Sequence, residues 1–334
     1  MRLNQRTKME KMSGLLETRG LTVELPTESG WIRPVNDVSL RIGAGESLGL
    51  VGESGSGKTM FSLALMGLLP SGARVSGNAE FFGATSGGAR ELTRLKNEEW
   101  RAIRGREIAM IFQEPMTSLN PVMRVGAQIE EGIRAHERGV SGGEVRRRML
   151  EALQHAAVPE PERRAEQYPH QLSGGLRQRV MIAMALACGP KLLIADEPTT
   201  ALDVTVQKQI LELLDRLRRE LKLGLLFITH DLGVVAQVAD RVAVLYAGRV
   251  VEEGLTSDVL RAPRHPYTQG LLAASPRLER GALRPIPGTV PSLTALPPGC
   301  AFEPRCAVRR EDCSRAVPAL RDAGAEHAAR CVLV

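Results

Sequence analysis

Residues 52–59, with the sequence GESGSGKT, constrain the fold of this chain more than any other segment. They fit the phosphate-binding pattern G-x-x-x-x-G-K-[ST] at every fixed position. The apolar residues 47–51 before them predict a short buried strand, and residues 60–66 after them predict a helix. A glycine-rich turn between a strand and a helix presents backbone N–H groups to an anion. The sequence therefore predicts an α/β protein with a nucleotide-binding core.

Within this segment, which we call the phosphate loop, two side chains have specific tasks. Lys58 can reach the β- and γ-phosphates of a nucleotide, and the Thr59 hydroxyl can hold Mg²⁺. A glycine-rich turn matches the pattern by chance in some proteins, so the other motifs of the chain decide between the two interpretations. The residues that we expect to bind the phosphates are Gly52, Ser54, Gly55, Ser56, Gly57, Lys58 and Thr59.

A pair of acidic residues follows the apolar residues 192–195, which predict a second buried strand. We expect Asp196 to hold Mg²⁺ and Glu197 to orient or deprotonate the attacking water. Phosphoryl transfer needs mainly positioning and charge neutralisation, so these carboxylates, Lys58 and Mg²⁺ are sufficient for it. Without the phosphate loop, the same pair would be interpreted as a solvated strand end.

Residues 172–179, LSGGLRQR, predict a second anion site. Ser173 and the two glycines after it begin an apolar helix, and the first turn of a helix has free N–H groups. A similar Ser-Gly-Gly at residues 141–143 is followed by Glu144, and a helix-capping box explains it better. The chain thus carries two candidate anion sites, one in the phosphate loop and one at this helix start.

The order of these motifs resembles that of the ATP-binding-cassette (ABC) ATPases. The resemblance covers residues 16–255, with residues 1–15 expected to be a flexible N-terminus. It implies a RecA-like phosphate-loop core with an antiparallel β subdomain and a helical insert subdomain over about residues 114–188. The motifs that carry it are GESGSGKT, Gln113 after a strand, LSGGLRQR, LLIADEP at 192–198, Ala201-Leu202-Asp203 and Ile228-Thr229-His230-Asp231.

This resemblance implies a head-to-tail dimer in which each ATP lies between the phosphate loop of one subunit and the LSGG segment of the other. Gln113 would then sense Mg²⁺ and the γ-phosphate, His230 would hold the γ-phosphate, and Asp203 would bridge the dimer. Taken alone, Gln113 and His230 would be interpreted as strand-end residues. The signature residues that would face the partner's ATP are Ser173, Gly174, Gly175 and Leu176.

Two positions depart from the family pattern. Leu176 follows LSGG where many members have Gln, although an importer subfamily commonly has an apolar residue there. The family also stacks adenine on an aromatic residue near the first strands, and the expected position, around Leu25, is not aromatic. Trp31 is the nearest candidate for adenine binding, and packing of its side chain on a β-hairpin is the alternative.

Further segments resemble the ATPase subunits of oligopeptide/dipeptide importers, namely MIFQEPMTSLNP at 110–121, QRVMIAMAL at 178–186 and RHPYT at 264–268. This resemblance implies a second ABC ATPase subunit, expected to be a paralogue, two transmembrane permease subunits and an extracytoplasmic solute-binding protein. The loop after Gln113, together with the helical insert, would dock the permease, and the chain would lie on the cytoplasmic face of the cell membrane. Importers of nickel, glutathione or sugars are the alternatives, because the cargo is not selected by this subunit.

Residues 256–334 are rich in Pro and Arg and are expected to form a small appended region with four of the five cysteines. Clustered cysteines in a reducing compartment more often bind metal than form disulfides. Four thiolates suit a 4Fe–4S cluster or a tetrahedral zinc ion. The subfamily resemblance favours the cluster, and four unliganded thiols are the remaining alternative. The four are Cys300, Cys306, Cys313 and Cys331.

Length and composition limit the other classes of function. The 334 residues contain no apolar run of transmembrane length and no signal-peptide core near the N-terminus. The net charge of +6 permits nucleic-acid binding, but aromatic residues are only 3% of the chain, which argues against base stacking. One cassette without heptads also argues against a soluble ABC ATPase that acts on nucleic acid, so we expect no nucleic-acid partner. The presence of Glu197 and His230 argues against a non-hydrolysing subunit.

Overall fold

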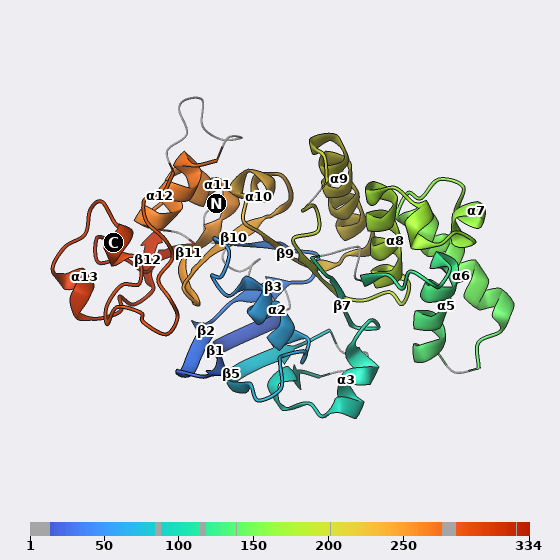
Figure 1. Ribbon diagram of the computed structural model, residues 1–334, viewed down its shortest axis with the longest axis horizontal. Helices are drawn as coiled ribbons and strands as arrows, with labels where there is room; N and C mark the ends of the chain where they lie inside the picture. Colours follow the sequence, from blue (N-terminus) through green and yellow to red (C-terminus); the bar gives the residue numbers. More distant parts are fainter. Residues whose placement is uncertain are drawn as a thin grey trace, which may run out of the picture.

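The computed structural model describes residues 14–83, 88–113, 118–137, 139–200, 202–275, 285–324 and 326–334. Most of the predicted flexible N-terminus lies outside these ranges. Residues 114–117 of the predicted docking loop and Ala201 also lie outside them. The described residues form two β-sheets, with a group of helices at one end of the molecule and a smaller C-terminal region at the other (Figure 1).

The larger sheet has eight strands and contains the predicted nucleotide-binding core. β10, β4, β9, β8 and β7 are parallel neighbours in that order. Every residue of β4, β8 and β9 is buried, as expected for parallel strands that are covered on both faces. The order across the sheet is β12 (Arg321–Gly324), β13 (His327–Ala329), β11 (Arg249–Leu255), β10 (Arg241–Tyr246), β4 (Ser47–Val51), β9 (Gly224–Thr229), β8 (Leu192–Asp196) and β7 (Ile108–Ile111).

The smaller sheet is antiparallel and packs against the larger sheet around helix α2 (Lys58–Leu65). The implied antiparallel β subdomain is present, and its first two strands form a hairpin in which Thr27 pairs with Gly30 across the turn. Leu50 and Ile228 of the larger sheet belong to the core that the two sheets share. The strands are β1 (Gly14–Thr27), β2 (Gly30–Val38), β3 (Arg41–Gly43), β5 (Arg74–Phe81) and β6 (Arg90–Glu91), followed by η1 (Leu92–Arg94) and α3 (Asn97–Ile103).

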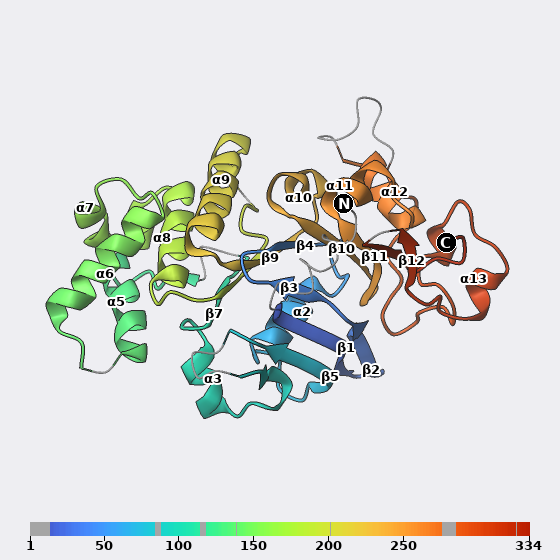
Figure 2. The same ribbon diagram turned by 180° about the vertical axis from the view of Figure 1, so that it is seen from behind.

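Helices follow the Gln113 segment, as the sequence predicts, and lie together at one end of the molecule in both views (Figures 1 and 2). Ser141 begins α6 by accepting a hydrogen bond from the Glu144 N–H at 3.3 Å, so the second Ser-Gly-Gly is a helix cap. The elements are α5 (Val125–His136), α6 (Gly142–His155), α7 (Pro161–Ala165), η2 (Pro169–Gln171) and α8 (Gly174–Leu186). Two later helices, α9 (Val204–Leu221) and α10 (Leu232–Val238), pack against the larger sheet.

The C-terminal region is joined to the core by a strand pairing that the sequence did not predict. β13 pairs with β11, so the larger sheet continues into the cysteine-rich segment. Glu252 of β11 is fully buried and accepts hydrogen bonds from the Arg264 and His265 N–H groups and from the His327 ring. The other elements are α11 (Thr256–Arg261), α12 (Pro266–Ala273), η3 (Glu303–Arg305) and α13 (Asp312–Arg315).

The α/β fold class with an antiparallel sheet and a helical part is therefore confirmed. Within the described ranges, no helix combines the length and the apolar character that a bilayer-spanning segment needs.

Candidate nucleotide-binding site

The parallel topology brings the predicted motifs to one edge of the larger sheet. The phosphate loop follows β4, Asp196 ends β8, and His230 follows β9. These three strands are adjacent and run in the same direction, so their carboxyl ends meet. Ligands of open α/β sheets bind at this edge.

Lys58 is buried within the phosphate loop, with only 5% of its surface exposed. Its Nζ donates hydrogen bonds to the carbonyl oxygens of Gly52 at 2.7 Å and Glu53 at 3.0 Å. Burial lowers the pKa of Lys58, and the nearby carboxylates of Glu197 and Asp196 oppose that shift. The ammonium is therefore held at the centre of the loop by backbone oxygens, and the carboxylates of Glu197, Asp196 and Glu53 all act on it.

The loop backbone depends on glycine at its last turn. Gly57 has a φ of +106°, in the region that side chains disfavour. A Cβ built there would lie 1.8 Å from the Pro34 carbonyl oxygen, so β2 packs directly against the loop. Ser56 is buried and its Oγ has no hydrogen-bond partner among the described residues, whereas Ser54 and Gly55 are exposed. The loop therefore presents both polar atoms and open backbone to a ligand.

Asp196 and Thr59 lie together, as the sequence predicts for a Mg²⁺ site. Asp196 is 1% exposed, and its Oδ1 is buried without a hydrogen-bond partner among the described residues. Burial raises the pKa of Asp196, while a hydrogen bond from the Thr59 side chain opposes the rise. A buried carboxylate oxygen without a partner, beside a hydroxyl, fits a hard divalent cation that binds oxygen ligands.

Glu197 is the centre of a small polar cluster, in which its Oε2 atom contacts three other side chains. The atom lies 3.3 Å from Gln113 Nε2, 3.0 Å from Thr200 Oγ1 and 3.4 Å from His230 Nδ1. Glu197 also has a positive φ of +47°, a strained conformation that is common at functional sites. The structure thus brings Gln113, Glu197 and His230 together. Thr200 was missed by the sequence analysis, although it lies only three residues after Glu197.

Glu197 and His230 shift each other's pKa in opposite directions. The hydrogen bond to His230 is the largest cause that lowers the pKa of Glu197, and the same bond is the largest cause that raises the pKa of His230. The charged pair therefore contributes stability between the lowered pKa of Glu197 and the raised pKa of His230. That contribution is lost as pH falls through the first value or rises through the second.

The signature residues lie on a different part of the molecule from the phosphate loop. Ser173 caps α8 by accepting a hydrogen bond from the Leu176 N–H, and Ser173 and Gly174 are exposed. Leu176 packs partly against the core of the helical part. Both views show α8 to one side of α2, which carries Lys58 (Figures 1 and 2). The start of α8 is therefore separate from the phosphate loop of the same chain.

Asp203 and Trp31 each have a local contact in this structure. Asp203 is exposed and caps α9, since its Oδ1 accepts a hydrogen bond from the Val206 N–H at 2.9 Å. Trp31 is 44% exposed, and the Arg74 guanidinium lies 3.9 Å from the ring centroid. One face of the indole ring is thus occupied by a cation. Bridging of a dimer by Asp203 and adenine stacking by Trp31 stay predictions.

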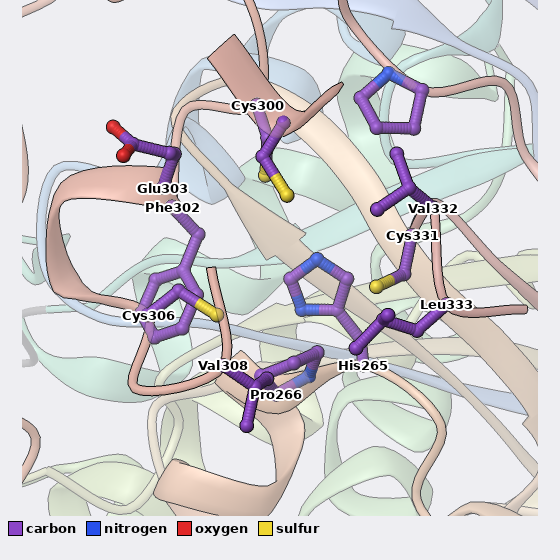
Figure 3. A pocket seen from close by; sticks show the side chains of 12 residues that line it. His265, Pro266, Cys300, Phe302, Glu303, Cys306, Val308, Cys331, Val332 and Leu333 are labelled. Atoms are coloured by element: carbon purple, nitrogen blue, oxygen red, sulfur yellow. The ribbon is translucent and has the colours of Figure 1, made fainter. Parts of the chain in front are cut away.

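The four clustered cysteines line one pocket. Cys300 and Cys306 flank η3, and the thiols of Cys300, Cys306 and Cys331 point toward the ring of buried His265 (Figure 3). Burial raises the pKa of the Cys300 thiol, and nearby Cys313 and Cys331 raise it further. In the described part of the chain, however, no three His, Cys, Asp or Glu side chains are arranged to hold a single metal ion. The sequence thus predicted the gathering of the cysteines, and the geometry gives no support to a metal ion among them.

Comparisons with known proteins match almost the whole chain. The family model described as "ABC transporter" matches residues 35–200, and that described as "Oligopeptide/dipeptide transporter, C-terminal region" matches residues 251–313. A Brucella ovis protein named as a peptide import ATP-binding protein is 50% identical over 95% of this chain and 96% of its own length. The oligopeptide transport ATP-binding protein OppD of Salmonella typhimurium is 51% identical over 91% of this chain and 89% of its own length.

A solved structure shares the fold of the cassette part. It is a dimeric ATP-binding cassette in a post-hydrolysis state with ADP and Pi, 31% identical to this chain, with a TM-score of 0.63. The match covers 72% of this chain and 98% of that one.

The Glu197–His230 pair leads to a prediction for the titration of the isolated chain. We expect the pKa of His230, followed by NMR, to lie above its ordinary value of 6.5 and to fall in Glu197→Gln. The fall follows because the carboxylate is the main group that stabilises the imidazolium, whereas burial destabilises it. His136, whose pKa is lowered by burial and by Arg106, serves as the control and should not move. An unchanged pKa of His230 in the variant would contradict the pairing.

Proposed function

Because this chain belongs to the ABC transporter ATPases and is an ATP-hydrolysing transporter subunit, we propose that it powers the import of di- and oligopeptides. The observation that carries the cargo assignment is the similarity of the whole chain, C-terminal region included, to proteins named for peptide import. A nickel, glutathione or sugar importer is the alternative. It would have the same site, because the cargo is selected by other subunits.

At the nucleotide site we propose a role for each residue, based on its contacts and burial. The phosphate loop binds the phosphates of ATP, Lys58 neutralises the β- and γ-phosphates, and Thr59 and Asp196 hold Mg²⁺. Glu197 orients or deprotonates the attacking water, and its contacts with Gln113 and His230 support that role. We propose that Gln113 senses Mg²⁺ and the γ-phosphate and that His230 holds the γ-phosphate.

We propose that the start of α8 serves the ATP of a second ABC ATPase subunit. The exposure of Ser173 and Gly174 and the position of α8 to one side of α2 (Figure 1) support this arrangement. The free N–H groups of the first turn of α8 favour an anion. Asp203, exposed at the start of α9, is proposed to contact the same partner, and that partner is proposed to be a paralogue.

As the ATPase of a peptide importer, the chain works with membrane permease subunits. We propose two such subunits, an extracytoplasmic solute-binding protein and a position on the cytoplasmic face of the cell membrane. The segment that follows Gln113 is proposed to dock the permease, because Gln113 contacts Glu197 directly. Loss of the γ-phosphate could then be transmitted from Glu197 to the membrane subunits.

For the cysteine pocket we propose a 4Fe–4S cluster, with zinc as the alternative. The proposal starts from the four thiols that line one pocket, although in the structure they are not arranged around a single metal ion. Cysteine thiolates are the usual ligands of such clusters. Cys300, Cys306, Cys313 and Cys331 would be the ligands, and the cluster would supply a redox-active or stabilising centre in the C-terminal region.

The proposed role of Glu197 is tested by Glu197→Gln in the assembled transporter. We expect ATP to bind as before, while the rate of hydrolysis falls by about 10²–10⁴-fold, the usual contribution of a general base. Glu212→Gln is the matched control, since Glu212 is exposed on α9 and pairs with Lys208. Hydrolysis at the wild-type rate in Glu197→Gln would show that another group activates the water.

The proposed cluster is tested by anaerobic purification of the full-length chain. We expect brown protein with equal amounts of iron and acid-labile sulfide, and loss of both in Cys331→Ser because a ligand is missing. Cys188→Ser is the matched control and should keep the colour, since Cys188 packs against the helical core instead. Colourless protein without iron would rule out the cluster, and one zinc ion per chain would identify the alternative.

A further inference from the structure

Arg305 of η3 connects the C-terminal region to the phosphate loop. It is 8% exposed, and it donates two parallel hydrogen bonds to the Glu53 carboxylate, from Nη1 at 2.7 Å and from Nη2 at 3.0 Å. Its Nε donates to the Pro287 carbonyl oxygen at 2.9 Å, and the guanidinium also reaches the Tyr246 hydroxyl at 3.3 Å. Such a two-pronged pair fixes both the position and the orientation of a carboxylate.

Glu53 is the only acidic residue of the phosphate loop, and it is held at its backbone as well. Its N–H donates to the hydroxyl of buried Tyr267 at 2.8 Å, and its carbonyl oxygen accepts from Lys58 Nζ at 3.0 Å. Tyr267 belongs to α12, which lies in the same C-terminal region as Arg305. Two residues from outside the cassette core therefore hold the loop residue that in turn holds Lys58.

We propose that Arg305 is a positioning residue for ATP binding, which it controls through Glu53. Arg305 neutralises a carboxylate that would otherwise repel the phosphates of ATP. Its positive charge also offsets the attraction between the Glu53 carboxylate and the Lys58 ammonium, which interact electrostatically. Through this contact the C-terminal region contributes to ATP binding. This inference rests on the proposed ATP site.

The experiment measures the affinity of the full-length chain for Mg²⁺-ATP. We expect Arg305→Ala to weaken binding by about tenfold, which corresponds to ~1.4 kcal/mol. In the double variant Arg305→Ala with Glu53→Gln, most of the affinity should return, because no unpaired carboxylate is left beside the phosphates. A residue that only stabilises the fold would not be rescued in this way, so the double-mutant cycle separates the two roles.

Arg330→Ala is the matched control. Arg330 anchors the same region by donating hydrogen bonds to the carbonyl oxygens of Val250 and Pro318, and neither of these residues belongs to the phosphate loop. We expect its ATP affinity to equal that of the wild type. If Arg305→Ala does not fold, Arg305→Gln, which is neutral but keeps a donor for Pro287, takes its place in the same comparison.

Three results would overturn the inference. They are wild-type affinity in the folded Arg305 variant, a double variant that binds as weakly as the single one, and an equal loss in Arg330→Ala. Each presupposes that the wild-type chain binds ATP. A wild-type chain that does not bind ATP would instead contradict the proposed ATP site itself, so the two failures are distinguishable.

Discussion

The hydrogen-bonded register of three parallel strands is the constraint on which the site depends. Val51 pairs with Thr229, and Asp196 pairs with Ile228, so β4, β9 and β8 end within one residue of each other. The positions of the reactive side chains follow from that alignment. Lys58 is placed after the first strand, Glu197 after the third and His230 after the second, which brings an ammonium, a carboxylate and an imidazole to one edge. Burial of the strands on both faces makes this edge rigid.

Local patterns in the sequence predicted this edge well. The apolar run before Gly52 and the one before Asp196 each predicted a buried strand, and the glycine-rich phosphate loop predicted the turn between β4 and α2. Such signals are local, because they depend on the preferences of neighbouring residues. The contacts of Glu197 with Gln113 and His230 could be expected only from the family resemblance, since they join segments far apart in the chain.

The C-terminal region was predicted least well, for a physical reason. β12 and β13 are short, and β13 exists because it pairs with β11 across more than seventy residues. The buried carboxylate of Glu252 and the link from Arg305 to Glu53 are likewise long-range contacts without a sequence pattern. Cys300 and Cys306 flank η3, which carries Arg305, so one short segment lines the cysteine pocket and also contacts the phosphate loop.

In the proposed arrangement, the two candidate anion sites of the chain serve ATP molecules shared with a second subunit. The rate of ATP hydrolysis by a strictly monomeric preparation tests this arrangement most directly. Sedimentation checks that the preparation is monomeric. We expect the monomer to bind ATP and to hydrolyse almost none of it, because Lys58 and Glu197 meet the start of α8 only across a partner. The assembled transporter should hydrolyse ATP at its full rate. A monomer that hydrolyses ATP as fast per chain as the assembled transporter would contradict the composite site.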